Sequence, residues 1–127
     1  MAEVNWSDFR NFSKEEFDCK ETGENRMRAH FLVNLQRVRD ALKTPIYVTS
    51  GFRSVHHSLE VVKKIPGMHT RGLAADIWVD ESHLYDLIEF SIRFGFNGIG
   101  VSNAPTGPKF IHLDLRPPDD KAIWSYR

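Results

Sequence analysis

The chain has 127 residues, of which 41% are hydrophobic, and its 17 basic residues balance its 17 acidic ones. This length and composition predict one domain spanning residues 1–127, with an apolar core that needs no disulfide or structural metal to fold. The neutral charge argues against a nucleic-acid partner, and no apolar run reaches the roughly 18 residues of a membrane span.

Helices are predicted before the first strand. Residues 13–16 form a capping box that opens a short helical turn. Asn25 is expected to cap a longer helix that Pro45 ends, and its apolar residues recur at helical spacing: Phe31, Leu35, Val38 and Leu42. Residues 46–48 then predict a short strand.

The middle of the chain is less regular. Residues 54–65 fit either a helix or a structured loop, and a turn is expected at residues 66–67. Small and apolar residues at 73–79 predict a buried strand, and a helix is expected to begin at Asp80 or Ser82.

Gly95 is predicted to end that helix. Residues 98–102 and 110–115 predict two further strands, joined by a turn at residues 103–108. Because strands and helices do not alternate regularly, we expect an α+β fold with a mainly antiparallel sheet flanked by helices.

Two histidines and one aspartate stand where they predict a metal site. His69 lies in a glycine-flanked turn, Asp76 lies in the apolar strand that follows, and His112 lies in a distant apolar strand. A buried carboxylate is costly unless it is paired or bound to a metal. Two histidines and a carboxylate can hold a catalytic zinc with one position left for water. A metal-free alternative pairs Asp76 with Arg53 or Arg71.

The motifs around these residues resemble those of the M15 peptidases, which comprise zinc D-Ala-D-Ala carboxypeptidases and L-alanyl-D-glutamate endopeptidases. The shared pattern is S-G-F-R-S at residues 50–54, H-T-R-G-L-A-A-D at 69–76, and the later His112. Small phage and prophage members share further segments, which stand here at residues 16–19, 22–25, 96–101, 110–114 and 123–126.

The resemblance implies the α+β fold of the Hedgehog signalling domain and of DD-peptidases. It implies one Zn²⁺ per chain, bound by His69, Asp76 and His112. Arg53 would bind a carbonyl or carboxylate of the substrate and stabilise the oxyanion. The implied activity is hydrolysis of peptide bonds in peptidoglycan stem peptides, either as a carboxypeptidase or as a murein endopeptidase.

The resemblance also implies where the protein acts. The N-terminal segment lacks the apolar core of a secretory signal, so we expect synthesis in the cytoplasm. A protein with this activity would then reach the bacterial cell wall by release or phage delivery, as a monomer without nucleic-acid or membrane partners.

The chain departs from the family pattern at the general base. Many M15 enzymes carry an acidic base three residues before the last ligand, and Lys109 stands there. Asp114 shares a strand face with His112 and is the remaining local carboxylate. It has three candidate roles: catalytic base, acceptor of a hydrogen bond from a metal-binding histidine, or ion-pair partner of Arg116.

Structural roles stand beside these functional ones. Arg53 could be a surface or capping residue, and Cys19, the single cysteine, is expected to be a buried free thiol. Three aromatic residues are expected to pack the core, or to line a substrate path: Trp78, Trp124 and Tyr126. The missing acid at Lys109 favours an alternative function, namely a non-catalytic cell-wall or protein binding module or a virion component.

Overall fold

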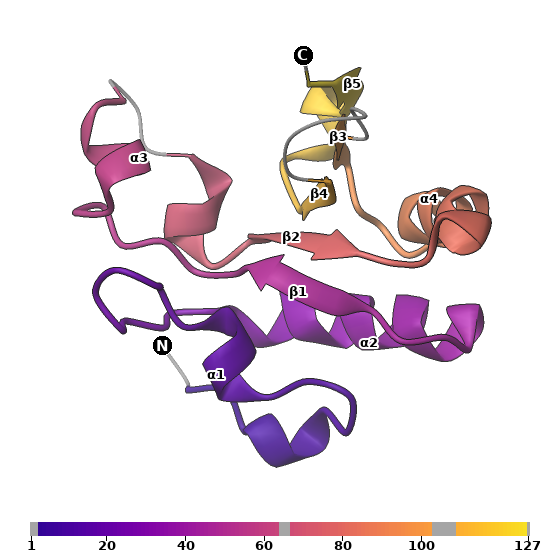
Figure 1. Cartoon of the computed structure of the whole chain (residues 1–127), viewed down its shortest axis with the longest axis horizontal. Helices are drawn as coiled ribbons and strands as arrows, with labels where there is room; N and C mark the ends of the chain where they lie inside the picture. The colour runs from indigo at the N-terminus through magenta and orange to yellow at the C-terminus, as the bar shows by residue number, and fades with distance from the viewer. Residues whose placement is uncertain (1–2, 64–66, 103–108, 127) are drawn as a thin grey trace.

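The computed structural model describes residues 3–63, 67–102 and 109–126. Its five strands form one sheet in the order β1-β2-β4-β3-β5 (Figure 1). The strands are β1 (Tyr47–Ser50), β2 (Ala74–Trp78), β3 (Gly98–Ser102), β4 (Phe110–Asp114) and β5 (Ala122–Ser125). Neighbouring strands are antiparallel except for β3 and β5, which are parallel. The structure therefore confirms the predicted α+β fold.

Four α-helices accompany the sheet in the described residues: α1 (Lys14–Phe17), α2 (Ala29–Leu42), α3 (Ser58–Val61) and α4 (Leu84–Arg93). In Figure 1, α1 and α2 lie below β1 and β2, whereas α3 lies above them at the left. Helix α4 follows the short 3₁₀ helix η3 (Glu81–His83) and contacts α2. None of the helices in the described ranges is long and apolar enough to cross a membrane.

The two faces of the sheet carry different side chains because successive residues of a strand point to opposite faces. One face is apolar and joins the core formed with α2, where Ile77, Ile111 and Leu113 are fully buried. The opposite face carries polar side chains from the same two strands. Asp76 of β2 pairs with His112 of β4, and two residues further along each strand Ala74 pairs with Asp114. The register thus brings the polar residues of two strands together on one face.

The helix boundaries agree with the sequence-based expectations in part. The capping box is confirmed, since the Ser13 N–H donates to Glu16 Oε1 at 2.8 Å. The prediction that Asn25 caps α2 is wrong, because Arg28 is the N-cap residue. Asn25 instead accepts a hydrogen bond from the Met27 N–H at 3.0 Å and donates to the Lys14 carbonyl at 3.2 Å. Its side chain therefore shapes the loop that precedes the helix.

Strand β5 was not expected, and residues 54–65 contain the short helix α3. The turn predicted at residues 103–108, and Pro66 of the turn predicted at 66–67, lie outside the described residues. Gly67 is described and is the N-cap of the 3₁₀ helix η2 (Met68–Arg71), which carries His69.

Candidate metal centre

Three side chains that are far apart in sequence converge on the polar face of the sheet. His69 comes from η2, Asp76 from the middle of β2 and His112 from the middle of β4, and they are 4%, 6% and 7% exposed. One ligand atom from each lies within 4.8 Å of the others. Asp76 Oδ1 is 3.3 Å from His69 Nε2 and 3.1 Å from His112 Nδ1. The structure thus assembles the residues that the sequence nominates as ligands.

The spacing of these atoms fits zinc. Ligand atoms about 2.0–2.1 Å from a tetrahedral zinc ion lie about 3.3 Å from one another. The two separations from Asp76 Oδ1, 3.3 Å and 3.1 Å, are close to that value. Two neutral histidines and one carboxylate would leave the ion a net positive charge, which suits a metal that activates water.

Each histidine is held by a hydrogen bond on the ring nitrogen that faces away from Asp76. His69 Nδ1 lies 2.8 Å from the Gly51 carbonyl oxygen, and His112 Nε2 lies 2.7 Å from Asp114 Oδ2. These acceptors select the tautomer in which the other nitrogen is free to bind a metal. An acceptor behind each ring is the usual arrangement around metal-binding histidines, and here Gly51 and Asp114 supply the two acceptors.

Gly51 reaches His69 because it packs against the backbone of Phe17. A Cβ atom at residue 51 would lie 2.5 Å from the Phe17 Cα. The next residue, Phe52, donates its N–H to the Phe17 carbonyl at 2.8 Å. The segment after β1 is therefore pressed against α1, and the Gly51 carbonyl is directed at the His69 ring.

Asp114 is fully buried between His112 and Arg116. Besides the bond to His112, its carboxylate accepts from Arg116 Nη2 at 2.8 Å, from Nε at 3.0 Å and from the Arg116 N–H at 3.0 Å. Burial would raise the pKa of Asp114, but the hydrogen bonds from His112 and Arg116 outweigh it and hold that pKa below its ordinary value. Two of the contacts considered from the sequence, the hydrogen bond with His112 and the ion pair with Arg116, are thus both made by Asp114.

The charges of the metal-free centre follow from the same contacts. Burial would raise the pKa of Asp76, but hydrogen bonds from His112 and His69 outweigh it and lower that pKa. Burial would lower the pKa of His112, but its bonds to Asp114 and Asp76 outweigh it and raise that pKa. Protons and a metal would compete for this ring, so metal affinity should fall with falling pH.

Arg53 lies beside the metal centre and is not a surface residue, since its side chain is 16% exposed. Its Nη2 donates to Asp76 Oδ2 at 3.3 Å, and its Nη1 donates to Glu60 Oε2 at 3.3 Å. Asp76 is therefore paired with Arg53, as the metal-free alternative requires. The pairing uses Oδ2, however, and leaves Oδ1 facing the two histidines, so it is compatible with a bound metal.

Glu60 was missed by the sequence-based reasoning. Its side chain is 0% exposed, and besides Arg53 it accepts from Lys63 Nζ and from the Gly67 N–H, each at 2.9 Å. Burial would raise its pKa, but these donors outweigh burial and lower the pKa to about 2. No local signal marks this residue, because it stands in a segment with both apolar and charged residues and no clear period.

Aromatic side chains line the same face beyond His112. The Trp124 ring centroid is 5.5 Å from that of His112, and the Arg116 guanidinium lies 4.7 Å above the Trp124 ring. Gly100 separates His112 from Trp124 across the three strands β4, β3 and β5. A Cβ at residue 100 would lie 2.7 Å from both Trp124 and Tyr126. Trp124 thus reaches the metal centre because Gly100 has no side chain.

Lys109 does not take the place of the missing acid. Its Nζ pairs with Glu81 Oε1 of η3 at 3.0 Å. Among the described residues, the other carboxylates at the centre are Asp114 and Glu60, both of which are buried and hydrogen-bonded.

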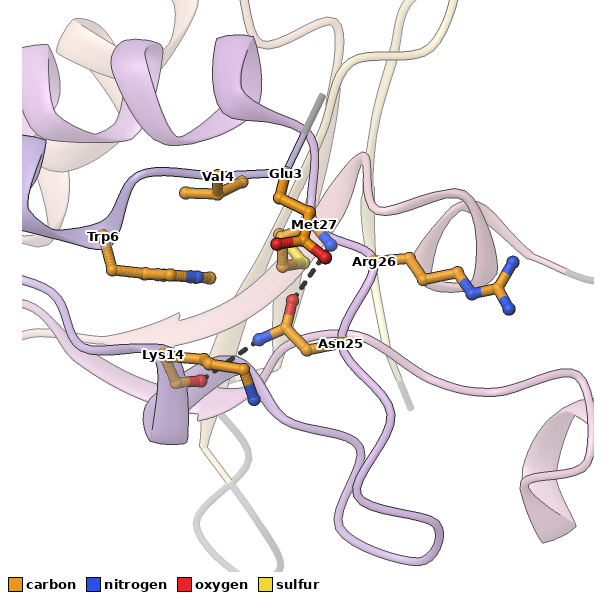
Figure 2. A pocket seen from close by; sticks show the side chains of 7 residues that line it. All are labelled: Glu3, Val4, Trp6, Lys14, Asn25, Arg26 and Met27. Carbon is orange, nitrogen blue, oxygen red and sulfur yellow. Dashed lines mark hydrogen bonds between the residues drawn. The ribbon is translucent and has the colours of Figure 1, made fainter. Parts of the chain in front are cut away.

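A separate pocket of about 440 Å³ lies near the N-terminus (Figure 2). Its lining residues are Glu3, Val4, Trp6, Lys14, Asn25, Arg26 and Met27. Figure 2 shows Asn25 bonded to the backbone of Met27 and of Lys14 across its wall. None of the predicted metal ligands lines this pocket, so the metal centre remains the candidate site of catalysis.

Comparison with known proteins supports that choice. The family described as Peptidase M15 matches residues 9–114, a range that includes all three candidate ligands, Arg53 and Asp114. A search among curated proteins gives no match.

Proposed function

Because the chain belongs to the Peptidase M15 family of zinc-dependent metallopeptidases, we propose that it binds zinc through His69, Asp76 and His112 and hydrolyses peptide bonds of peptidoglycan. The observation that carries the proposal is the convergence of these three residues, each histidine being oriented by a hydrogen bond to Gly51 or Asp114. Metal-binding histidines are oriented in this way, by an acceptor on the second ring nitrogen.

Bound zinc would supply a Lewis acid that polarises the scissile carbonyl and lowers the pKa of water. The residues around it supply orientation and charge. Asp76 contacts the two histidines with Oδ1 and accepts a hydrogen bond from Arg53 with Oδ2. The remaining N–H groups of Arg53 can donate to a substrate carbonyl oxygen and to the negative charge that develops on it.

Asp114 is proposed to orient His112 rather than to act as the base. It contacts Nε2 of the ring, whereas Nδ1 is the nitrogen that faces Asp76. The imidazole therefore stands between the Asp114 carboxylate and the candidate metal position. The lowered pKa of Asp114 also makes it a weak proton acceptor at neutral pH.

The substrate is proposed to be the peptide stem of peptidoglycan, cut either at a terminal D-Ala-D-Ala bond or at an internal bond. The support is the likeness of residues 50–54 and 69–76 to the motifs of wall-active M15 enzymes. Trp124 beside His112 offers a flat apolar wall for a substrate near the metal. Action on the bacterial wall as a monomer, after release or phage delivery, belongs to the same proposal.

Digestion of purified peptidoglycan tests this function. Mass spectrometry should show muropeptides shortened at one type of bond, with loss of activity on chelation and recovery on addition of zinc. His69→Ala should lose both metal and activity. Peptidoglycan that stays uncut by the zinc-loaded protein would contradict hydrolysis. Specific binding to the same wall material would then favour the non-catalytic binding module, the alternative suggested by Lys109 at the position of the acidic base.

A further inference from the structure

We propose that Glu60 is a positioning residue that fixes the Arg53 guanidinium beside the metal centre. The inference rests on the proposed function, in which Arg53 acts on the substrate. Glu60 does not contact the candidate ligands through its side chain, so its effect must pass through Arg53 and through the turn that carries His69.

The burial of Glu60 is unusual for its location. Helix α3 has four residues, and its neighbours Leu59 and Val61 are 54% and 61% exposed, whereas the Glu60 side chain is 0% exposed. Burying a carboxylate is costly unless its oxygens are hydrogen-bonded. Here Lys63, Gly67 and Arg53 satisfy the carboxylate. The chain therefore places a fully compensated charge in contact with Arg53.

Arg53 is held at both ends of its fork. Nη1 donates to Glu60 and Nη2 donates to Asp76, each at 3.3 Å. Two carboxylates that bind opposite ends of a planar guanidinium fix both its position and its rotation. The Nε–H and one hydrogen on each terminal nitrogen then remain for a substrate. Without Glu60, the contact with Asp76 alone would leave the group free to turn.

Glu60 also joins this arginine to the turn of His69. Its Oε1 accepts the N–H of Gly67, the residue that precedes η2. The Arg53 N–H in turn donates to the His69 carbonyl at 3.2 Å. The loop after β1 and the metal-binding turn are thus tied together, which accounts for a carboxylate at this position better than a role in holding α3 alone.

Glu21 provides a matched control. It holds the same helix, since its carboxylate accepts from the Ser58 N–H at 3.1 Å and from Ser58 Oγ at 2.7 Å, and it pairs with His57 Nε2 at 3.1 Å. Its partners in the described part of the chain are Ser58 and His57, whereas the Arg53 guanidinium pairs with Glu60 and Asp76. If the role of Glu60 were only to hold α3, Glu21→Gln and Glu60→Gln would have similar effects.

The experiment measures turnover of a wall peptide and zinc affinity in the zinc-loaded variants. We expect Glu60→Gln to lower kcat/KM by about 10-fold or more without a loss of zinc affinity, as removal of an orienting partner commonly does. Glu21→Gln should retain wild-type turnover. Glutamine keeps one oxygen that can accept from the Gly67 N–H, so its effect should pass through Arg53. In an Arg53→Ala background, Glu60→Gln should therefore cause no further loss.

A spectroscopic measurement is independent of activity. The NMR signals of the Arg53 guanidinium, assigned with Arg53→Lys, should report slow rotation in the wild type and faster rotation in Glu60→Gln. If Glu60→Gln does not fold, Glu60→Asp withdraws the carboxylate by one methylene and serves the same comparison.

Unchanged guanidinium signals, or losses that add fully in the double variant, would overturn the role of Glu60. Wild-type turnover in Arg53→Ala would instead refute the proposed role of Arg53, so the two failures are distinguishable.

Discussion

Asp114→Asn separates the three roles considered for this carboxylate. Asparagine has the same shape but one acceptor oxygen and one NH₂ group in place of two charged acceptors. In the native protein one oxygen faces His112 Nε2 at 2.7 Å and Arg116 Nη2 at 2.8 Å, and the other accepts from the Arg116 backbone and Nε. Whichever way the amide is turned, its NH₂ group faces another donor.

The size of the effect follows from these contacts. At least one hydrogen bond to a charged group is lost, at a cost of about 1.5–3 kcal/mol, and the half-buried Arg116 loses its counter-charge. We expect the zinc-free protein to lose about 3 kcal/mol of unfolding free energy. Because His112 also loses the acceptor that orients it, zinc affinity should fall by roughly 10–100-fold.

Two measurements on the same variant suffice. Competition with a chelator gives the zinc affinity, and the dependence of kcat/KM on pH gives the ionisations of the free enzyme. Asp119→Asn, at an exposed carboxylate in the short helix η4 (Pro118–Asp120), should leave both unchanged and serves as the control.

An unchanged zinc affinity in Asp114→Asn, together with loss of one limb of the pH profile, would refute the orienting role and identify Asp114 as the base. Wild-type values for both quantities would leave only the ion pair with Arg116 and would remove Asp114 from the site.

Further substitutions test the neighbouring contacts. Arg53→Ala should keep its zinc and lose at least about 10²-fold in kcat/KM, and Arg53→Lys should restore little of it; full turnover in Arg53→Ala would show that the arginine does not act on the substrate. Gly100→Ala should cost about 1–3 kcal/mol of stability and alter the near-UV spectrum of Trp124, because the new Cβ would lie 2.7 Å from that ring; the exposed change Ser125→Ala should do neither, and an unaltered spectrum in Gly100→Ala would contradict the close packing. The pKa of Glu60 is lowered from 4.5 to about 2, so its stabilising contribution is complete above pH 4.5 and is lost as the pH falls from 4.5 towards 2. The difference in unfolding free energy between wild type and Glu60→Gln should therefore be smaller at about pH 3 than at about pH 5, and an equal difference at both would refute the assigned shift.

The sequence predicted the elements whose pattern is local. The apolar spacing of residues 31–42 anticipated the body of α2, and the small and apolar run at 73–79 anticipated β2. The start of α2 was misplaced because Asn25 uses its side chain in the preceding loop. Strand β5 was missed because it has only four residues, lies at the edge of the sheet and is mostly exposed, and its residues show no alternation of apolar and polar side chains.

The chemistry of the site was also readable from the sequence, as far as residue types go. His69, Asp76 and His112 stand in apolar or glycine-flanked segments where such side chains need a shared partner, and the family match covers all of them. Only the tertiary structure showed which residues hold the ligands and Arg53 in place. Gly51 lies behind His69, and Glu60 lies behind Arg53. Neither contact leaves a periodic signal, because each joins loop residues whose approach depends on how the segments between them pack.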